Sequence, residues 1–271
     1  MTQSKPIFID THCHLNFDSF DANRDEIIQQ ASAVGVTRLI IPAVDLESSQ
    51  QALDLSSQHE GIFAAVGVHP NSTADFNEQT RQQVRQLSFK DHVVAIGEIG
   101  LDYYWDKSPK STQKVAFEAQ LNLAKERELP VIIHNREAHE DIMAILEDWA
   151  QDLPPSLMNR AGVLHSFSAP AEIADRALAI GFYLGFTGPI TFKNADDLRR
   201  VALTVPLDRI LLETDAPFLT PHPHRGKRPN KPQYIPFIAD RLAALHHLNI
   251  EEIAQHTTQN ALRLFNLEQT Q

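Results

Sequence analysis

The stretch TQKVAFEAQLNLAKERELPVIIHN, residues 112–135, contains the unit from which this chain is built. Its first part, Thr112–Arg127, repeats apolar residues at helical spacing and stops shortly before Pro130, which cannot continue a helix. Its second part, Pro130–Asn135, is almost entirely apolar before His134, as expected of a parallel strand covered on both faces. A helix followed by a buried strand that ends in a polar side chain is typical of α/β proteins.

The same alternation runs through the whole chain. Further helical patterns lie at Arg24–Val34, Glu140–Trp149 and Ala171–Ile180, and the predicted strands are Ile7–His14, Arg38–Val44, Phe63–Pro70, Val93–Asp102, Pro130–Asn135, Gly162–Phe167, Tyr183–Ile190 and Ile210–Pro217. Eight strands that alternate with helices, with no linker between them, predict a single (β/α)8 TIM-barrel domain over residues 1–271. A doubly wound open sheet is the alternative, less favoured because no glycine-rich phosphate loop follows the first strand. A last amphipathic helix, Ile250–Leu267, is expected to close the outside.

The amino-acid composition limits the classes of protein to which this chain can belong. The 271 residues are 42% hydrophobic and 22% charged, which suits a globular chain with a sizeable core. The single cysteine excludes an intrachain disulfide, and no apolar run or signal segment stands out, so we expect a cytoplasmic protein. The net charge of −11 argues against a broadly basic nucleic-acid surface, although divalent cations and one basic loop would allow a nucleic acid to bind locally. No obligate protein partner is evident, and the oligomeric state stays open.

Polar residues collect at the ends of the predicted strands, where a barrel of this type builds its active site. The residues concerned are His12, His14, His69, Glu98, His134, His165 and Asp215. One buried histidine is more often a hydrogen-bonded core residue than a metal ligand. A whole cluster of partly desolvated imidazoles and carboxylates is costly unless a cation compensates it, so the pattern predicts a metal site.

The segment FIDTHCHLNF, residues 8–17, shows how strand geometry refines the ligand set. Side chains alternate across a strand, so His12 and His14 point one way and Cys13 points the other, toward the helices, as a packing residue. Asp10 lies one layer deeper and would orient a ligand imidazole. Glu213 stands in the same relation to Asp215; alternatively, both acids are simply paired inside the barrel.

Six motifs, DTHCHL, GVHP, IGEIGLDYY, VIIHNREA, LHSFS and LLETDAPFL, are similar to the signatures of TatD-type metal-dependent deoxyribonucleases, a branch of the amidohydrolase superfamily. The resemblance extends from Phe8 to the Asn260–Phe265 helix. It implies two divalent ions per subunit, Mg²⁺, Mn²⁺ or Zn²⁺, at the barrel mouth. By this resemblance His12, His14, Glu98 and Asp215 hold one ion, and Glu98 bridges to a second ion held by His134 and His165.

The resemblance also implies a reaction, the hydrolysis of phosphodiester bonds in DNA, either at single-stranded ends or at damaged positions. Two neighbouring cations would activate a water and stabilise the attacking and leaving oxygens, with Glu98 and Asp215 as catalytic residues and Asp215 as the general base. The alternative is ester or amide hydrolysis of a small metabolite or an aminoacyl-tRNA by the same scaffold.

Several residues are candidates for substrate contact. Arg136 would clamp a phosphate, unless it is a surface residue paired with Glu137 or Glu140. His69 is placed to touch substrate or carry a proton. Tyr103, Tyr104 and Trp105 either stack bases or cap the barrel mouth. The loop PHPHRGKRPNKPQYI, residues 221–235, has no acidic residue and would guide a polyanion through Arg225, Lys227, Arg228 and Lys231. The family often has Asn-Glu-Pro where this chain has Asn230-Lys231-Pro232, which leaves the contacts of the loop open.

Overall fold

Eight parallel strands pair in sequence order in the computed structural model, which describes residues 5–267. They are β1 (Phe8–Asp10), β2 (Val36–Pro42), β3 (Ile62–Val66), β4 (Val93–Asp102), β5 (Val131–Arg136), β6 (Gly162–Leu164), β7 (Phe182–Phe186) and β8 (Ile210–Leu212). The sheet closes on itself because the Thr11 amide donates to the Leu212 carbonyl at 3.0 Å and Cys13 bridges Ala216. The predicted barrel is therefore confirmed, and the open-sheet alternative is wrong.

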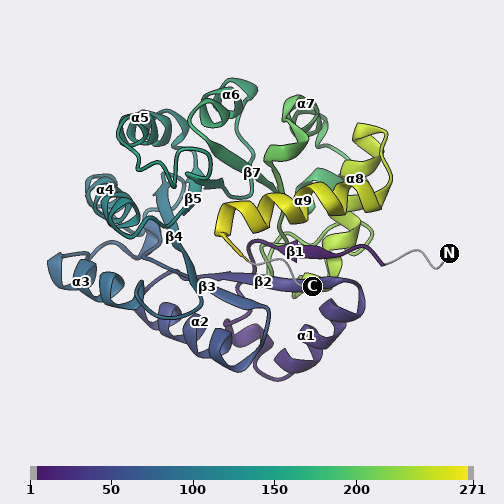
Figure 1. Ribbon diagram of the computed structural model, residues 1–271, viewed down its shortest axis with the longest axis horizontal. Coiled ribbons are helices and arrows are strands. Elements are labelled where there is room, and N and C mark those ends of the chain that lie inside the picture. The colour runs from purple at the N-terminus through teal and green to yellow at the C-terminus, as the bar shows by residue number, and fades with distance from the viewer. Residues whose placement is uncertain (1–4, 268–271) are drawn as a thin grey trace.

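Helices surround the barrel (Figure 1). They are α1 (Arg24–Ala33), α2 (Leu46–Gln58), α3 (Glu78–Leu87), α4 (Lys110–Arg127), α5 (His139–Ala150), α6 (Ala171–Ala179), α7 (Asp196–Thr204) and α8 (Ile235–His246), followed by α9 (Ile250–Phe265). Within residues 5–267, no helix has the length and apolar character needed to cross a membrane.

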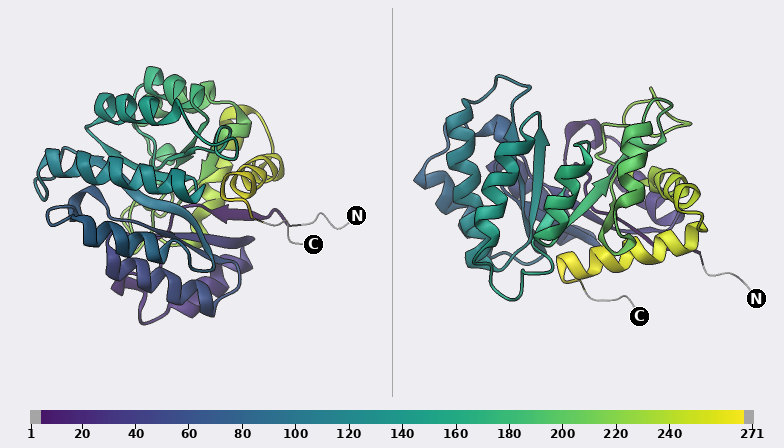
Figure 2. Two further views of the ribbon diagram at one scale, coloured as in Figure 1. Left: turned by 60° about the vertical axis from the view of Figure 1, so that its left-hand side comes forward. Right: turned by 90° about the horizontal axis from the view of Figure 1, so that it is seen from above.

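The barrel interior is filled by one cluster of apolar side chains to which every strand contributes, for example Ile9, Ile132 and Leu211. Helix α9 adds Ala261, Leu264 and Phe265 to the same cluster. It runs along the underside of the barrel (Figure 2, right). The C-terminal helix was expected on the outside; instead it seals the N-terminal end of the strands, because its apolar face completes the interior core. The opposite end is left open for chemistry.

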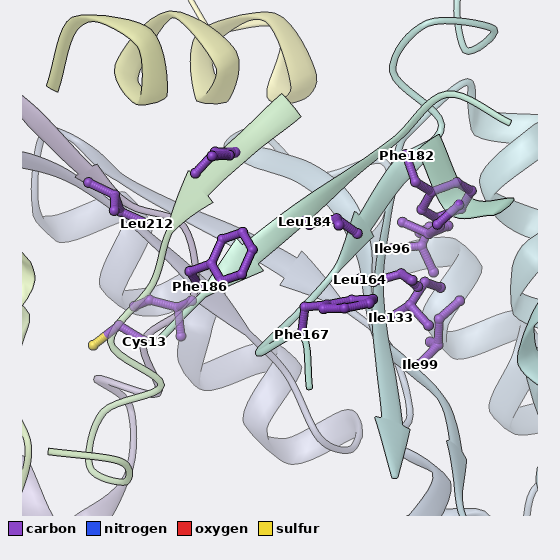
Figure 3. Packing of buried hydrophobic residues seen from close by; sticks show 14 of the residues in the cluster. Cys13, Ile96, Ile99, Ile133, Leu164, Phe167, Phe182, Leu184, Phe186 and Leu212 are labelled. Atoms are coloured by element: carbon purple, nitrogen blue, oxygen red, sulfur yellow. The ribbon is translucent and has the colours of Figure 1, made fainter. Parts of the chain in front are cut away.

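A second, larger cluster lies between the strands and the surrounding helices. Cys13 is fully buried in this cluster, together with Phe186 and Leu212 (Figure 3). Burial raises the pKa of the Cys13 thiol well above its usual value. The prediction that Cys13 is a packing residue is confirmed.

Most predicted strands continue several residues beyond the observed ones at their C-terminal ends, whereas β4 has the predicted bounds. The strand pairing ends early because the chain turns at the barrel mouth. His12, His69, His165 and Asp215 all lie just past the last paired residue of their strands. Their side chains are consequently carried by turns that the rigid barrel fixes.

Candidate metal centre

Glu98 occupies the middle of the centre. It lies in β4, is only 3% exposed, and sits where the register between β4 and β5 shifts, between Ile96 and Ile99. Its two carboxylate oxygens face two different groups of side chains. The centre therefore divides into two halves that share one carboxylate.

The first half gathers around Oε2 of Glu98. The Nε2 atoms of His12 and His14 lie 3.4 and 3.7 Å from this oxygen and 3.2 Å from each other. Oδ1 of Asp215 lies 3.8 Å from Nε2 of His12 and 3.6 Å from Nε2 of His14. The two imidazole nitrogens thus lie within 4 Å of one carboxylate oxygen of Glu98 and of one of Asp215.

The second half gathers around Oε1 of Glu98. Nδ1 of His134 lies 2.8 Å from it, Nε2 of His165 lies 3.4 Å away, and Nε2 of His69 lies 3.7 Å away. His69 therefore belongs with the potential metal ligands, whereas its position in the sequence predicted only a substrate or proton-transfer role. The order of the strands does not show that Nε2 of His69 lies close to Oε1 of Glu98, because this distance depends on the conformation of the turn after β3.

The spacing of these atoms fits bound cations. Ligand atoms at about 2.0–2.2 Å from a tetrahedral ion lie about 3.3–3.6 Å from one another, close to the separations in the first half. Three groups of residues each bring three donor atoms within 4.8 Å of one another. They are His12, His14 and Glu98; His69, Glu98 and His134; and His12, His165 and Asp215, which come from both halves of the centre. Imidazole with carboxylate suits Zn²⁺ or Mn²⁺, and Mg²⁺ less tightly. The residues present therefore fit a metal centre.

Neighbouring groups hold the imidazoles of two candidate ligands. Nδ1 of His14 lies 3.2 Å from the Pro42 carbonyl, which can only accept, so this nitrogen donates and Nε2 is free to bind a cation. His134 lies between two carboxylates, with Nε2 3.0 Å from Oδ2 of Asp102 and Nδ1 2.8 Å from Oε1 of Glu98. Burial lowers the pKa of His134, but these two contacts outweigh it and raise that pKa. Asp102 was not among the predicted site residues.

The two acids predicted behind the ligands have different surroundings. Glu213 is fully buried, with Oε2 at 3.3 Å from Nδ1 of His165, so it is placed to orient that ring. Asp10 instead accepts from the backbone amides of His12 and Thr214 and from the Thr214 hydroxyl. Asp10 thus holds the backbone beside His12, and over residues 5–267 no hydrogen bond or ion pair joins its carboxylate to an imidazole.

Electrostatics in the centre follow from burial and from close charges. Burial lowers the pKa of His165, but the charge of Glu98 and the contact with Glu213 outweigh it and raise that pKa to about 9. Burial, with His134 nearby, lowers the pKa of His69 to about 3. Burial alone would raise the pKa of Glu98; the surrounding histidines, led by His165, hold it well below its usual value. The site thus keeps a charged carboxylate between its two halves.

Asp215 adopts a left-handed backbone conformation, with φ at 53°, which is uncommon for a residue other than glycine. Its amide donates to the His12 carbonyl, and its own carbonyl accepts from the Phe218 amide. These bonds hold a strained turn that aims the carboxylate at His12 and His14. Asp215 is 14% exposed, so water can reach it.

Apart from His69, the predicted substrate contacts Arg136, Arg225 and Lys227 are outside the groups of potential metal ligands. Arg136 ends β5, and its guanidinium carbon lies 4.1 Å from the centroid of the Tyr104 ring. Over the described residues it forms no ion pair with Glu137 or Glu140, and Glu140 pairs with Arg176 instead. Arg225 and Lys227 are exposed on the loop after β8, where Arg225 lies over the Phe192 ring.

The basic loop is anchored at its far end. Asn230 is fully buried, and its amide nitrogen donates to the carbonyls of Thr214 and Phe218. The loop therefore returns to the turn that carries Asp215, even though Lys231 stands where the family often has Glu.

Comparison with known proteins agrees with this geometry. A family model described as TatD related DNase matches residues 9–266. The chain belongs to the TatD family. It is 44% identical over 261 residues to YabD, a metal-dependent hydrolase of Bacillus subtilis (strain 168), covering 96% of this chain and all of that protein. It is 38% identical over 263 residues to the 3'-5' ssDNA/RNA exonuclease TatD of Erwinia tasmaniensis, covering 95% and 99% of the two chains.

A solved structure supports the assignment. The crystal structure of YJJV, a TatD homologue from Escherichia coli, superimposes with a TM-score of 0.89 at 35% identity and covers 96% of this chain and 98% of that one. The chain is accordingly a metal-dependent hydrolase of the TatD family.

Proposed function

We propose that this TatD-family hydrolase cleaves phosphodiester bonds in DNA, removing nucleotides from single-stranded ends or cutting at damaged positions, with two divalent ions that share Glu98. The observation that carries the proposal is the division of donor atoms around the two oxygens of Glu98, at 3.4–3.7 Å on one side and 2.8–3.7 Å on the other. Two ions about 3.5–4 Å apart stabilise both the attacking and the leaving oxygen of such a bond.

Each half of the centre has a proposed role. One ion would be held by His12, His14, Asp215 and Glu98, and the other by His134 and His165 together with Glu98. Asp215 accepts the proton of the attacking water, because it is the ligand carboxylate that solvent reaches. Glu213 keeps the His165 ring oriented.

The rim favours an anionic substrate. Arg136 is exposed, with its guanidinium carbon over the Tyr104 ring. Arg225 and Lys227 are exposed on the loop after β8, which has no acidic residue. The described residues give these three cations no ion pair that would neutralise them. A neutral ester or amide of a small metabolite would need none of them. One relative, 38% identical to this chain, is a 3'-5' ssDNA/RNA exonuclease, which also favours a nucleic-acid substrate.

A cleavage assay tests the proposal. End-labelled single-stranded DNA, duplex DNA and duplex DNA with one abasic site are incubated with the metal-supplemented protein and with Glu98→Gln and Asp215→Asn. We expect nucleotide release from single-stranded ends or cutting at the abasic site, loss of activity with EDTA, recovery with Mg²⁺ or Mn²⁺, and a decrease of about 10²–10⁴-fold in Asp215→Asn.

Equal release by the wild-type protein and Glu98→Gln would assign the activity to a contaminant and refute the nuclease. Hydrolysis of esters or aminoacyl-tRNA, with every DNA left intact, would establish the alternative function instead.

A further inference from the structure

Two aromatic side chains stand exposed directly after β4. Tyr104 is 50% exposed and Trp105 is 48% exposed, and their ring centroids are 4.8 Å apart in an edge-to-face arrangement. Scattered exposed aromatics are ordinary in proteins, but a contacting pair beside an active site is a surface available to a ligand. Both side chains are about half exposed, so they are not buried as a cap over the barrel mouth.

Cations accompany the pair. The guanidinium carbon of Arg136 lies 4.1 Å from the Tyr104 ring centroid and 5.9 Å from that of Trp105. Nζ of Lys107 lies 5.9 Å from the Trp105 ring centroid. Aromatic rings interleaved with cations bind unpaired nucleotides, because bases stack on the rings while phosphates meet the positive charge.

Asp102 ties this surface to the metal centre. Its Oδ1 accepts from the amides of Tyr104 and Trp105 at 3.0 Å each, and its Oδ2 lies 3.0 Å from Nε2 of His134. Asp102 is 1% exposed, so these bonds are shielded from water. One carboxylate thus holds both the turn that carries the two rings and the imidazole of His134, a candidate metal ligand.

We propose that Tyr104 and Trp105 form a stacking platform for an unpaired base next to the phosphate that is cleaved. This inference rests on the proposed nuclease function and deepens it, because a base inside a duplex is already stacked on both faces. The platform therefore selects frayed or single-stranded ends. The Arg136 edge meets the adjoining phosphate while its face supports Tyr104.

Tryptophan fluorescence provides a direct readout that does not depend on turnover. The chain has two tryptophans, and Trp149 is 5% exposed with its indole N–H donated to the Leu121 carbonyl, so a base reaches only Trp105. The metal-loaded protein is titrated with a single-stranded phosphorothioate oligonucleotide, which resists cleavage, and with an abasic strand of equal length and charge. We expect saturable quenching by the first strand and little by the second.

Dye-labelled oligonucleotides then give affinities by fluorescence anisotropy. Tyr104→Ala and Trp105→Ala are expected to bind about tenfold or more weakly, and Trp105→Phe, which keeps a stacking face, is expected to bind nearly as the wild type. Phe89→Ala is the matched control, since Phe89 is also an exposed ring under arginine, 3.6 Å from Cζ of Arg127, but precedes β4 at the other end of the barrel.

Wild-type affinity in both alanine variants, or equal quenching by the abasic strand, would overturn the platform. If the same protein still cleaves DNA, the proposed function survives that result. Absence of binding to every strand, together with absence of cleavage, would overturn both.

Discussion

Some residues of the candidate centre could be predicted from their positions in the sequence. Glu98, His134 and Asp215 could be predicted because each lies in or just past a strand, and the barrel brings all strand ends together. Asp102 ends β4 and so meets the same criterion, but it was not among the predicted site residues. Its partners, Asn71 and His134, come from the neighbouring segments after β3 and in β5, and their closeness depends on exact register and turn geometry.

Asp102 provides a test at this scale. A carboxylate serves the amides of Tyr104 and Trp105 with one oxygen and His134 with the other, whereas the amide of Asp102→Asn has a single acceptor oxygen. If that oxygen stays with the turn, the amide N–H₂ faces Nε2 of His134 and moves the ring proton to Nδ1, the atom that faces Glu98. We expect Asp102→Asn to bind one ion instead of two, measured by elemental analysis after dialysis.

The ring tautomer, read from ¹⁵N chemical shifts of the imidazoles, separates this cause from general damage. Asp141→Asn is the matched control, because Asp141 is a 41% exposed acid that accepts from Tyr103 on the same side of the barrel and does not touch His134. Two ions bound to Asp102→Asn with unchanged affinity would contradict the assigned role.

At the scale of elements, the starts of the strands and the bounds of the named helices agree with the sequence to within about two residues. The strand ends do not agree. Polar residues such as His12 and His165 continue the strand-like run in the sequence, but in the fold they belong to turns after the last paired residue. Alternation still places Cys13 correctly, among apolar side chains.

The contribution of helix α9 to stability can be tested at one of its buried leucines. Leu264 is fully buried in the barrel interior at the end opposite the metal centre. We expect Leu264→Ala to lower the free energy of unfolding by about 2–5 kcal/mol, measured by urea denaturation, because it leaves a cavity in the sealed core. Metal content should not change. In barrels of this type the active site lies at the C-terminal end of the strands, whereas residues at the N-terminal end contribute to stability.

Leu203→Ala is the control for this loss. Leu203 lies in α7 and is 49% exposed, so the same truncation should cost little. A Leu264→Ala protein that keeps its stability but loses its ions would show that α9 supports the site rather than the core.

For the whole molecule, the fold follows from alternation of strands and helices, and the site follows from the polarity of the strand ends. The net charge of −11 is an average over the whole chain and does not describe how single charges are placed. Arg136, Arg225 and Lys227 stand without acidic partners in the described part of the chain. An acidic protein can therefore present a cationic rim to a polyanion, because short-range charge governs contact when salt screens the rest.

In the proposed function, the carboxylate of Glu98 joins two cation sites. Anomalous diffraction from crystals grown with Mn²⁺ tests this arrangement. We expect two peaks on either side of Glu98, one beside His12, His14 and Asp215 and one beside His134 and His165. A single peak, or two peaks that Glu98 does not bridge, would contradict it.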